Sequence, residues 1–211
     1  MKTRLAVLIS GTGSNMQSIA SACEQADFPA EIALVLSNKS KAPGLAFANQ
    51  KGIRTAIVPH GKFEDRQTFE QAIHQELCTA KVELICLAGF MRILSTFLVS
   101  RWDGKMLNVH PSLLPSLRGL NTHQRALDAG LRVHGCTVHQ VSTELDDGPI
   151  LGQAAISVQS SDTAETLQKR VLRVEHQLYP AVIARACFHL QGISAPQDKP
   201  DQPINTIFSL Q

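Results

Sequence analysis

The chain has 211 residues, 44% of them hydrophobic, which is enough to bury one sizeable core in a single domain. Its 20 basic and 18 acidic residues give a formal net charge of +2. This balance argues against a nucleic-acid partner, because general nucleic-acid binders carry a clustered basic surface. The uncharged apolar runs at residues 5–9 and 84–90 are strand-sized and too short to span a bilayer, so no membrane partner is expected.

The N-terminal sequence and the cysteines indicate the cellular compartment of the protein. The start of the chain shows no apolar signal region and no small-residue cleavage site. The five cysteines are odd in number and contain no CxxC pair, so we expect reduced, buried thiols rather than disulfides or metal ligands. Both observations favour a cytoplasmic protein.

Strand and helix signals alternate along the chain, which is typical of a parallel α/β sheet. Strands are predicted at residues 4–10, 31–37, 55–58, 82–88, 105–109, 136–142 and 150–158. Helices are predicted at residues 15–26, 43–50, 63–79 and 121–129, followed by a long helix with its buried stripe at Leu167, Val171, Val174 and Leu178. The predicted fold is therefore a single-domain, Rossmann-like α/β fold, with a mostly parallel, twisted sheet of about seven strands flanked by helices.

The last long helix carries its own signals. Asp162 is expected to cap it, with Glu165 completing a capping-box-like pair. Pro180 should kink or break the helix. The domain is expected to cover residues 1–193, with residues 194–211 forming a loosely attached tail.

The first candidate site is the turn around Gly11 and Gly13, after the first predicted strand. Glycines let the backbone approach a phosphate, and the following helix start offers free N–H groups. A dinucleotide fingerprint fails, because Met16 occupies its third glycine position and Asn38 follows the second strand where an acid is needed. A monophosphate site fits better than NAD, and a tight turn without a ligand carries equal weight.

The second candidate pairs Asn108 with His110 at the end of the fifth predicted strand. Residues two apart on a strand share a face, and open α/β sheets bind ligands outside the carboxyl ends of their strands. The alternative is a structural pair that holds the proline-rich segment after it. The third candidate is the acidic run 144–149, ordinarily a solvated turn. Its Asp146 gains a function if the fold brings it near His110, because a carboxylate stabilises an imidazolium.

Amide, imidazole and carboxylate are the groups needed to move an acyl unit onto an amine. The amide can donate to a developing oxyanion, and the imidazole can hold or move a proton. No serine or cysteine lies in a recognisable nucleophile elbow, which favours direct transfer between two bound substrates.

Four ordered motifs, at residues 13–15, 87–94, 108–115 and 144–149, together resemble the folate-dependent formyltransferases. The resemblance extends from about residue 4 to the last helix. It implies transfer of the formyl group of 10-formyltetrahydrofolate to the amine of glycinamide ribonucleotide, a step of de novo purine biosynthesis. It implies two small-molecule substrates and no metal, and it is compatible with a homodimer.

The resemblance also implies residue roles. The residues matching the catalytic trio are Asn108, His110 and Asp146. Those matching the phosphate and ribose contacts of glycinamide ribonucleotide are Gly13, Ser14, Asn15 and Glu175. Those matching the folate pocket are Met91, Arg92, Ile93, Leu94, Ser142, Thr143, Glu144, Leu145 and Asp146. Two departures are Asp147, where many members have a small residue, and Asn121, where relatives commonly have histidine.

Other functions remain open at this point. A formyltetrahydrofolate hydrolase of the same fold would use water as acceptor, but such relatives carry an N-terminal regulatory domain for which Met1–Thr3 leave no room. A methionyl-tRNA formyltransferase needs a further C-terminal domain. A dinucleotide-dependent oxidoreductase needs the fingerprint that Met16 and Asn38 break. A binding module without catalysis should lack one of the trio. Among the remaining histidines, His123 is expected to be structural, and His134 and His139 are expected on opposite faces of a strand. His139, on the strand leading into the acidic run, either supports the site or is an ordinary packed histidine, and the packed role is favoured.

Overall fold

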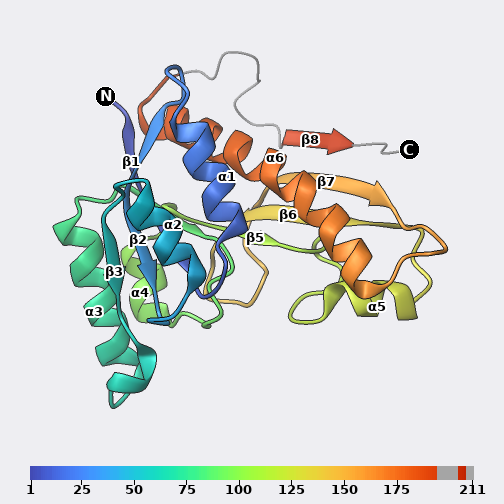
Figure 1. Ribbon diagram of the computed structural model, residues 1–211, viewed down its shortest axis with the longest axis horizontal. Helices are drawn as coiled ribbons and strands as arrows, with labels where there is room; N and C mark the ends of the chain where they lie inside the picture. Colours follow the sequence, from blue (N-terminus) through green and yellow to red (C-terminus); the bar gives the residue numbers. More distant parts are fainter. Residues whose placement is uncertain (194–203, 208–211) are drawn as a thin grey trace. The chain divides into compact units, whose positions relative to one another are not determined.

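The computed structural model describes residues 1–193 and the backbone of residues 204–207. These form two compact units, Met1–Asn108 and Val109–Gln211 (Figure 1). The boundary between them falls inside strand β5, Met106–His110. Each unit is a small α/β structure.

The first unit contains a parallel sheet in the order β3-β2-β1-β4-β5. Its strands are β1 (Thr3–Ile9), β2 (Ala30–Ser37), β3 (Thr55–Ile57), β4 (Leu84–Leu87) and the start of β5. The apolar side chains from Leu5 to Ile9 are 0% exposed. Such continuous apolar runs form because helices cover both faces of a parallel sheet.

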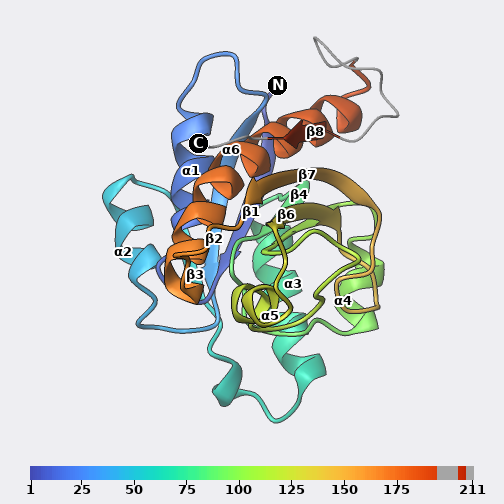
Figure 2. The same ribbon diagram turned by 90° about the vertical axis from the view of Figure 1, so that its right-hand side faces the viewer.

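Helices α1 (Ser14–Cys23) and α2 (Pro43–Gln50) cover one face of this sheet, and α3 (Arg66–Thr79) and α4 (Thr96–Arg101) the other (Figure 2). The right-handed rule for parallel crossovers explains the alternation, since the chain moves outward from β1 to β3 and then returns to β4. A 3-10 turn, η1 (His60–Lys62), precedes α3.

Helix α4 was not predicted, because six residues are too few to show a helical period. Its position is set by Glu70 of α3, which is 0% exposed. The Glu70 carboxylate accepts a hydrogen bond of 2.7 Å from the backbone N–H of Ser95, and a second from the Ser95 hydroxyl. Ser95 is the N-cap of α4. A buried carboxylate at this helix start therefore satisfies donors that would otherwise lack partners.

The second unit contains β6 (Val133–Gln140) antiparallel to β7 (Ile150–Ser157), and β8 (Ile204–Ile207) parallel to β7. The long helix α6 (Ala164–Leu190) packs against β6, β7 and α5 (Thr122–Asp128). The predicted stripe is confirmed, because Leu167, Val171, Val174 and Leu178 are all at most 2% exposed.

Two predictions about α6 were wrong. Its N-cap is Thr163, not Asp162, and the capping box pairs Thr163 with Thr166 rather than with Glu165. The Asp162 carboxylate instead contacts Arg170 Nη1 at 2.6 Å.

Pro180 lies inside α6 and does not break it. Proline in a helix interior costs about 3 kcal/mol. Leu178, Tyr179, Val182 and Ile183 are buried on either side of it, and their packing outweighs that cost.

The remaining predicted bounds lie within a few residues of those observed, and β6 begins earlier than expected, at Val133. Of the predicted tail, residues 194–203 and 208–211 lie outside the described part of the chain, so the domain bounds stay a prediction. No described helix is long and apolar enough to cross a membrane. All five cysteines are free thiols, but the expectation that all are buried was wrong, because Cys78 is exposed and Cys23 is only partly buried.

Candidate active site

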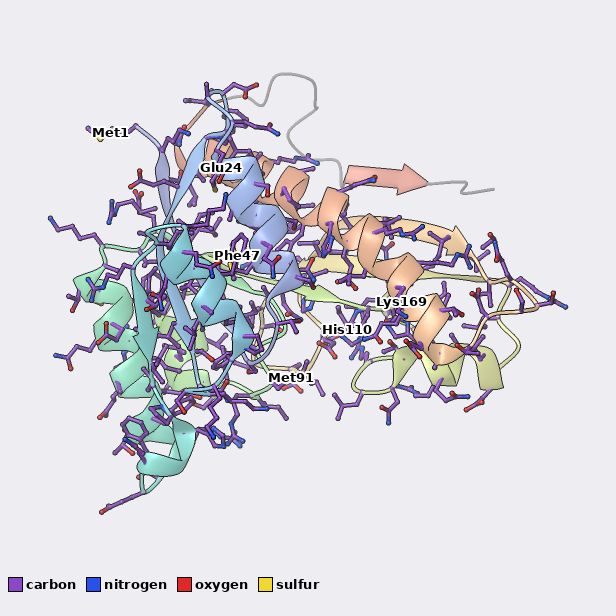
Figure 3. All side chains as sticks on the ribbon, in the orientation of Figure 1. Met1, Glu24, Phe47, Met91, His110 and Lys169 are labelled. Carbon is purple, nitrogen blue, oxygen red and sulfur yellow. The ribbon has the colours of Figure 1, made fainter. Side chains whose placement is uncertain are left out.

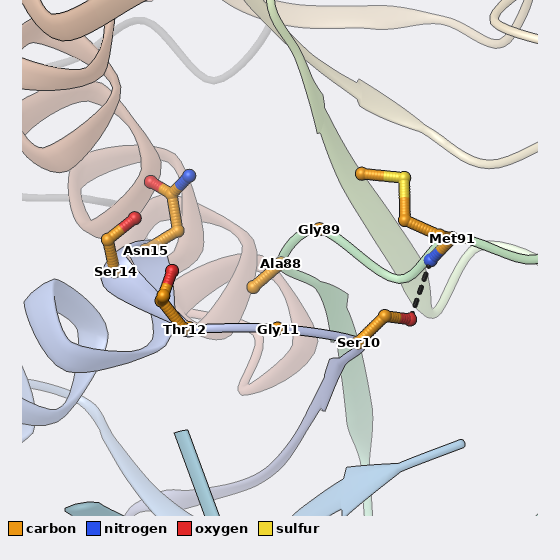
Figure 4. Close-up of a pocket in the computed structure, with 9 residues that line it drawn as sticks. Ser10, Gly11, Thr12, Ser14, Asn15, Ala88, Gly89 and Met91 are labelled. Atoms are coloured by element: carbon orange, nitrogen blue, oxygen red, sulfur yellow. Dashed lines mark hydrogen bonds between the residues drawn. The ribbon is translucent and has the colours of Figure 1, made fainter. Parts of the chain in front are cut away.

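A pocket of about 210 Å³ lies in the first unit where β1 ends and α1 begins (Figure 4). We call it the glycine-turn pocket. Its lining residues come from two strand ends and the start of one helix: Ser10, Gly11, Thr12, Gly13, Ser14, Asn15, Ala88, Gly89 and Met91. The predicted residues Gly13, Ser14 and Asn15 are thus brought together in one concave place.

The backbone of this pocket suits an anion. Gly13 is the N-cap of α1 in the left-handed conformation, with φ 67°, which favours glycine. No side chain caps this helix start. The first N–H groups of α1 and the positive end of its dipole are therefore available to a phosphate, which favours the ligand-binding interpretation over a bare turn.

Gly44 of α2, which was not predicted as a site residue, packs against the glycine turn. Its N–H donates to the Gly11 carbonyl at 3.1 Å. A Cβ at Gly44 would lie 2.6 Å from Ile9 Cδ1 and 3.1 Å from the Thr12 carbonyl oxygen. The turn can thus approach α2 only because residue 44 has no side chain.

Ser10 ties the other side of the pocket. Its hydroxyl donates to Asn38 Oδ1 at 2.6 Å and accepts from the Met91 N–H at 2.8 Å (Figure 4). Asn38, the residue that breaks the dinucleotide fingerprint, therefore supports the end of β1. Its amide also contacts His60 Nδ1 at 3.3 Å.

In the second unit, His110 and Asp146 are in contact. His110, labelled in Figure 3, ends β5 and is 6% exposed. Its Nδ1 lies 3.3 Å from Asp146 Oδ2. The other ring nitrogen, Nε2, donates to the Leu117 carbonyl at 3.1 Å. Asp146 Oδ2 also accepts from the Gly119 N–H at 3.0 Å. The structure therefore brings together two members of the predicted trio.

Asn108 precedes His110 by two residues in the same strand. Successive side chains of a strand alternate between its faces, so the amide and the imidazole project from the same side of β5. The pairing of Asn108 with His110 stays a prediction.

His139 joins the cluster, although an ordinary packed role was expected. Its Nδ1 donates to the Gln140 carbonyl at 2.9 Å, and its Nε2 lies 3.9 Å from Asp146 Oδ1. Burial lowers the pKa of His139, while Gln140 and Asp146 act in the opposite direction. A register shift lies opposite Val138 and His139, where the extra residue, Leu151, belongs to β7. The expectation that His134 and His139 lie on opposite faces of β6 stays a prediction.

His134 and His123 form a separate structural pair. His134 Nε2 lies 3.2 Å from His123 Nδ1, and the two rings meet edge to face. Burial lowers the pKa of His134 to about 4 and also lowers that of His123. Two neutral rings can share one proton donor and one acceptor, so the structural interpretation of both is supported. Among the described residues, no group of three or more potential ligands could hold a metal ion.

The acidic run, residues 144–149, packs closely against β6 at Gly148. A Cβ there would lie 1.8 Å from the Gln140 carbonyl oxygen, so only glycine fits against β6. Asp146 adopts a left-handed backbone, with φ 52°. Asp147 points elsewhere, forming an ion pair with Arg118. Sequence reasoning missed Gly148 and Arg118, because neither contact involves residues close in the chain.

The residues predicted for the folate pocket belong to two segments, one in each unit. In the first, Met91 and Ile93 are 64% and 61% exposed, Arg92 is exposed, and Leu94 is buried (Figure 3). In the second, Leu145 is 52% exposed; Thr143 and Glu144 are exposed, and Ser142 is half-buried. Each segment thus exposes apolar side chains, and the predicted folate contact stays a prediction.

Glu175 of α6 is 7% exposed. Burial, reinforced by the charge of Glu175, raises the pKa of the Cys136 thiol. The predicted ribose contact is thus a buried carboxylate on the long helix.

Comparison with known proteins shows the family to which the chain belongs. The profile described as formyl transferase matches residues 3–183, and the chain belongs to this family. It is 46% identical over 180 residues to phosphoribosylglycinamide formyltransferase of Haemophilus influenzae, covering 85% of each chain. The crystal structure of phosphoribosylglycinamide formyltransferase from Brucella melitensis is 48% identical with a TM-score of 0.86, covering 89% of this chain and 96% of that one.

A longer relative is also similar. The chain is 48% identical over 182 residues to the trifunctional purine biosynthetic protein adenosine-3 of Gallus gallus, and the match covers 86% of this chain but 18% of that protein. The chain therefore spans about a fifth of such relatives. The likeness to solved structures confirms the predicted α/β fold with a mostly parallel sheet flanked by helices.

Proposed function

We propose that this chain transfers the formyl group of 10-formyltetrahydrofolate to the amine of glycinamide ribonucleotide, giving N-formylglycinamide ribonucleotide and tetrahydrofolate in de novo purine biosynthesis. The observation that carries the proposal is the contact between His110 and Asp146 at the end of the strand that also holds Asn108. The similarity to phosphoribosylglycinamide formyltransferases supports the same substrates.

The glycine-turn pocket would hold the phosphate of glycinamide ribonucleotide. The N–H groups of Gly13, Ser14 and Asn15 open the first turn of α1, where an anion is stabilised by donors and by the helix dipole. Glu175 would accept hydrogen bonds from ribose hydroxyls. The rest of the specificity for glycinamide ribonucleotide would then come from recognition of its amine, which is the group that reacts.

The trio would act on the reacting carbonyl. Attack of the amine on the formyl carbon creates a tetrahedral intermediate with a negative oxygen. Asn108 and protonated His110 would donate hydrogen bonds to that oxygen, and one such donor is typically worth about 3 kcal/mol. Asp146 would hold His110 through their contact of 3.3 Å and would move a proton from the amine to the departing folate nitrogen, through water.

The folate cosubstrate would be held by the two segments that expose apolar side chains. Met91, Ile93 and Leu145 offer surfaces for the pterin ring, and Arg92 offers a positive charge for an anionic group. The other residues of these segments, from Ser142 to Glu144, supply polar and backbone groups. No metal takes part in this scheme.

The rival is hydrolysis of 10-formyltetrahydrofolate, with water as the acceptor, and the named relatives do not favour it. The test is to incubate the protein with 10-formyltetrahydrofolate, with and without glycinamide ribonucleotide, and to follow folate absorbance. We expect turnover only when the amine is present. Turnover without it would indicate a hydrolase, and no turnover in either case would contradict the proposal.

Location and assembly stay predictions. The five free thiols are compatible with a cytoplasmic protein. A homodimer is left to measurement of the mass in solution.

A further inference from the structure

The segment after His110 is held in two different ways. Its first part is anchored to buried neutral groups: Thr137 Oγ1 donates to the Ser112 carbonyl at 2.7 Å and accepts from the Leu114 N–H at 3.0 Å. Gln153 donates to the Leu114 carbonyl at 2.9 Å. Further along the segment, the three residues that follow Ser116, namely Leu117, Arg118 and Gly119, are here called the loop tip. Their contacts are with the acidic run, α5 and His110.

The loop tip contacts both proposed catalytic side chains. The Leu117 carbonyl accepts from His110 Nε2, and the Gly119 N–H donates to Asp146 Oδ2. A carbonyl oxygen can only accept, so Nε2 carries a hydrogen. The nitrogen left to face Asp146 is Nδ1. The tip therefore helps to fix the orientation of the His110 ring.

The backbone of the tip needs support. Leu117 has φ 55° and Gly119 φ 79°, both in the left-handed region. A leucine adopts that conformation only where its surroundings impose it. Arg125 Nη1 supplies one restraint, donating to the Arg118 carbonyl at 2.6 Å. The Arg118 side chain supplies the other, through its ion pair with Asp147.

We propose that Asp147 is a positioning residue for the formyl transfer proposed above, on which this inference rests. By holding Arg118, it keeps the Leu117 carbonyl on His110 Nε2 and the Gly119 N–H on Asp146. Asp147 thereby acts through the tip and not on substrate. Its role differs from that of Asp146, although the two residues are adjacent.

The size of the effect follows from the exposure of the pair. Both side chains are 43% exposed, and exposed ion pairs are weak and screened by salt. Losing the pair should shift the equilibrium of the tip by roughly two- to fivefold. A loss of that order is expected in kcat, and it should shrink as salt concentration rises.

The test compares Asp147→Asn and Arg118→Gln with the reversed pair, Arg118→Asp combined with Asp147→Arg. Each single change should lower kcat while the KM for glycinamide ribonucleotide stays constant, and the reversed pair should recover most of the loss. The matched control is Glu165→Gln, which breaks the exposed pair with Lys169 on α6 and should change neither constant. Single variants with wild-type kcat, or a reversed pair that recovers nothing, would overturn the proposal.

A second readout needs no turnover. In the substrate-free protein, Asp147→Asn should speed hydrogen exchange of the Gly119 N–H and shift the ¹⁵N signal of His110 Nε2 as its hydrogen bond to the Leu117 carbonyl weakens, both measured by NMR. If these signals change in a protein that proves inactive in formyl transfer, the positioning role stands and the proposed function fails. If they match the wild type, Asp147 does not position the tip.

Discussion

The glycine-turn pocket presents backbone N–H groups and short neutral side chains, whereas the cluster around His110 consists of titratable side chains. The pocket depends on where the chain can pass, because Gly13 needs a left-handed φ and Gly44 must lack a Cβ. The cluster around His110 depends on which nitrogens of its imidazole rings carry a hydrogen. A binding site of the first kind is sensitive to added volume, and a site of the second kind is sensitive to lost charge.

Removing the charge of Asp146 should have the largest effect. Asp146→Asn keeps the shape of the side chain but cannot stabilise a charged His110 or move a proton. We expect kcat to fall by ~10²–10⁴-fold, with substrate binding largely intact. Single-turnover rates with calorimetric affinities would measure both.

The matched control is Asp128→Asn, an exposed aspartate at the end of α5. It should leave the rate constant unchanged. If Asp146→Asn turned over at a near-wild-type rate, the catalytic role would pass to Asp147, against the contacts seen here.

His110→Ala is the next largest change. It removes one proposed donor to the oxyanion, and such a donor is typically worth ~10²–10³-fold in kcat. The rate should fall much more than the affinity for either substrate. Measured dissociation constants that weaken as much as kcat falls would indicate that His110 only binds, and His189→Ala, an exposed change on α6, serves as the control.

Adding volume to the pocket should separate binding from chemistry. In Gly44→Ala, the new Cβ would press on Ile9 and on the Thr12 carbonyl oxygen. Overpacking of this kind costs ~1–3 kcal/mol. Because the turn must then move, the KM for glycinamide ribonucleotide should rise by at least ~5-fold, the equivalent of about 1 kcal/mol, with kcat little changed.

Steady-state kinetics would measure this split. Gly61→Ala is the matched control, because nothing lies within 4 Å of a Cβ at that position. A loss in kcat without a change in KM would mean that the turn does not hold this substrate.

Much of the fold could be predicted because strands with both faces covered carry continuous apolar runs, as at residues 5–9. The pairing of Asn108 with His110 follows from strand alternation alone. Gly44, Gly148 and the Leu117 carbonyl could not be predicted, since each acts through its backbone or through the lack of a side chain, which leaves no chemical signal in the sequence. The choice of Thr163 over Asp162 as N-cap fails for a different reason: both side chains can cap, and one residue of register decides between them.

The smallest prediction concerns His134, which lies beside the cluster in β6 and has no part in the proposed chemistry. Burial lowers its pKa from 6.5 to about 4 in the folded chain. Between these values the unfolded chain binds the proton and the folded chain does not, so stability is full above pH 6.5 and is lost as pH falls toward 4. Its share of that loss is on the order of 1–3 kcal/mol.

His134→Gln tests this share, because an amide can still pair with His123 but does not titrate. Denaturant unfolding between pH 7 and pH 4 should show a shallower loss of stability in the variant than in the wild type. Contributions from carboxylates are common to both proteins, so the difference isolates the imidazole. Parallel curves would mean that His134 is charged, or solvated, in the folded state. Besides the carboxylates, His123 and His139, whose pKa values burial also lowers, would then remain as sources of acid sensitivity in the second unit.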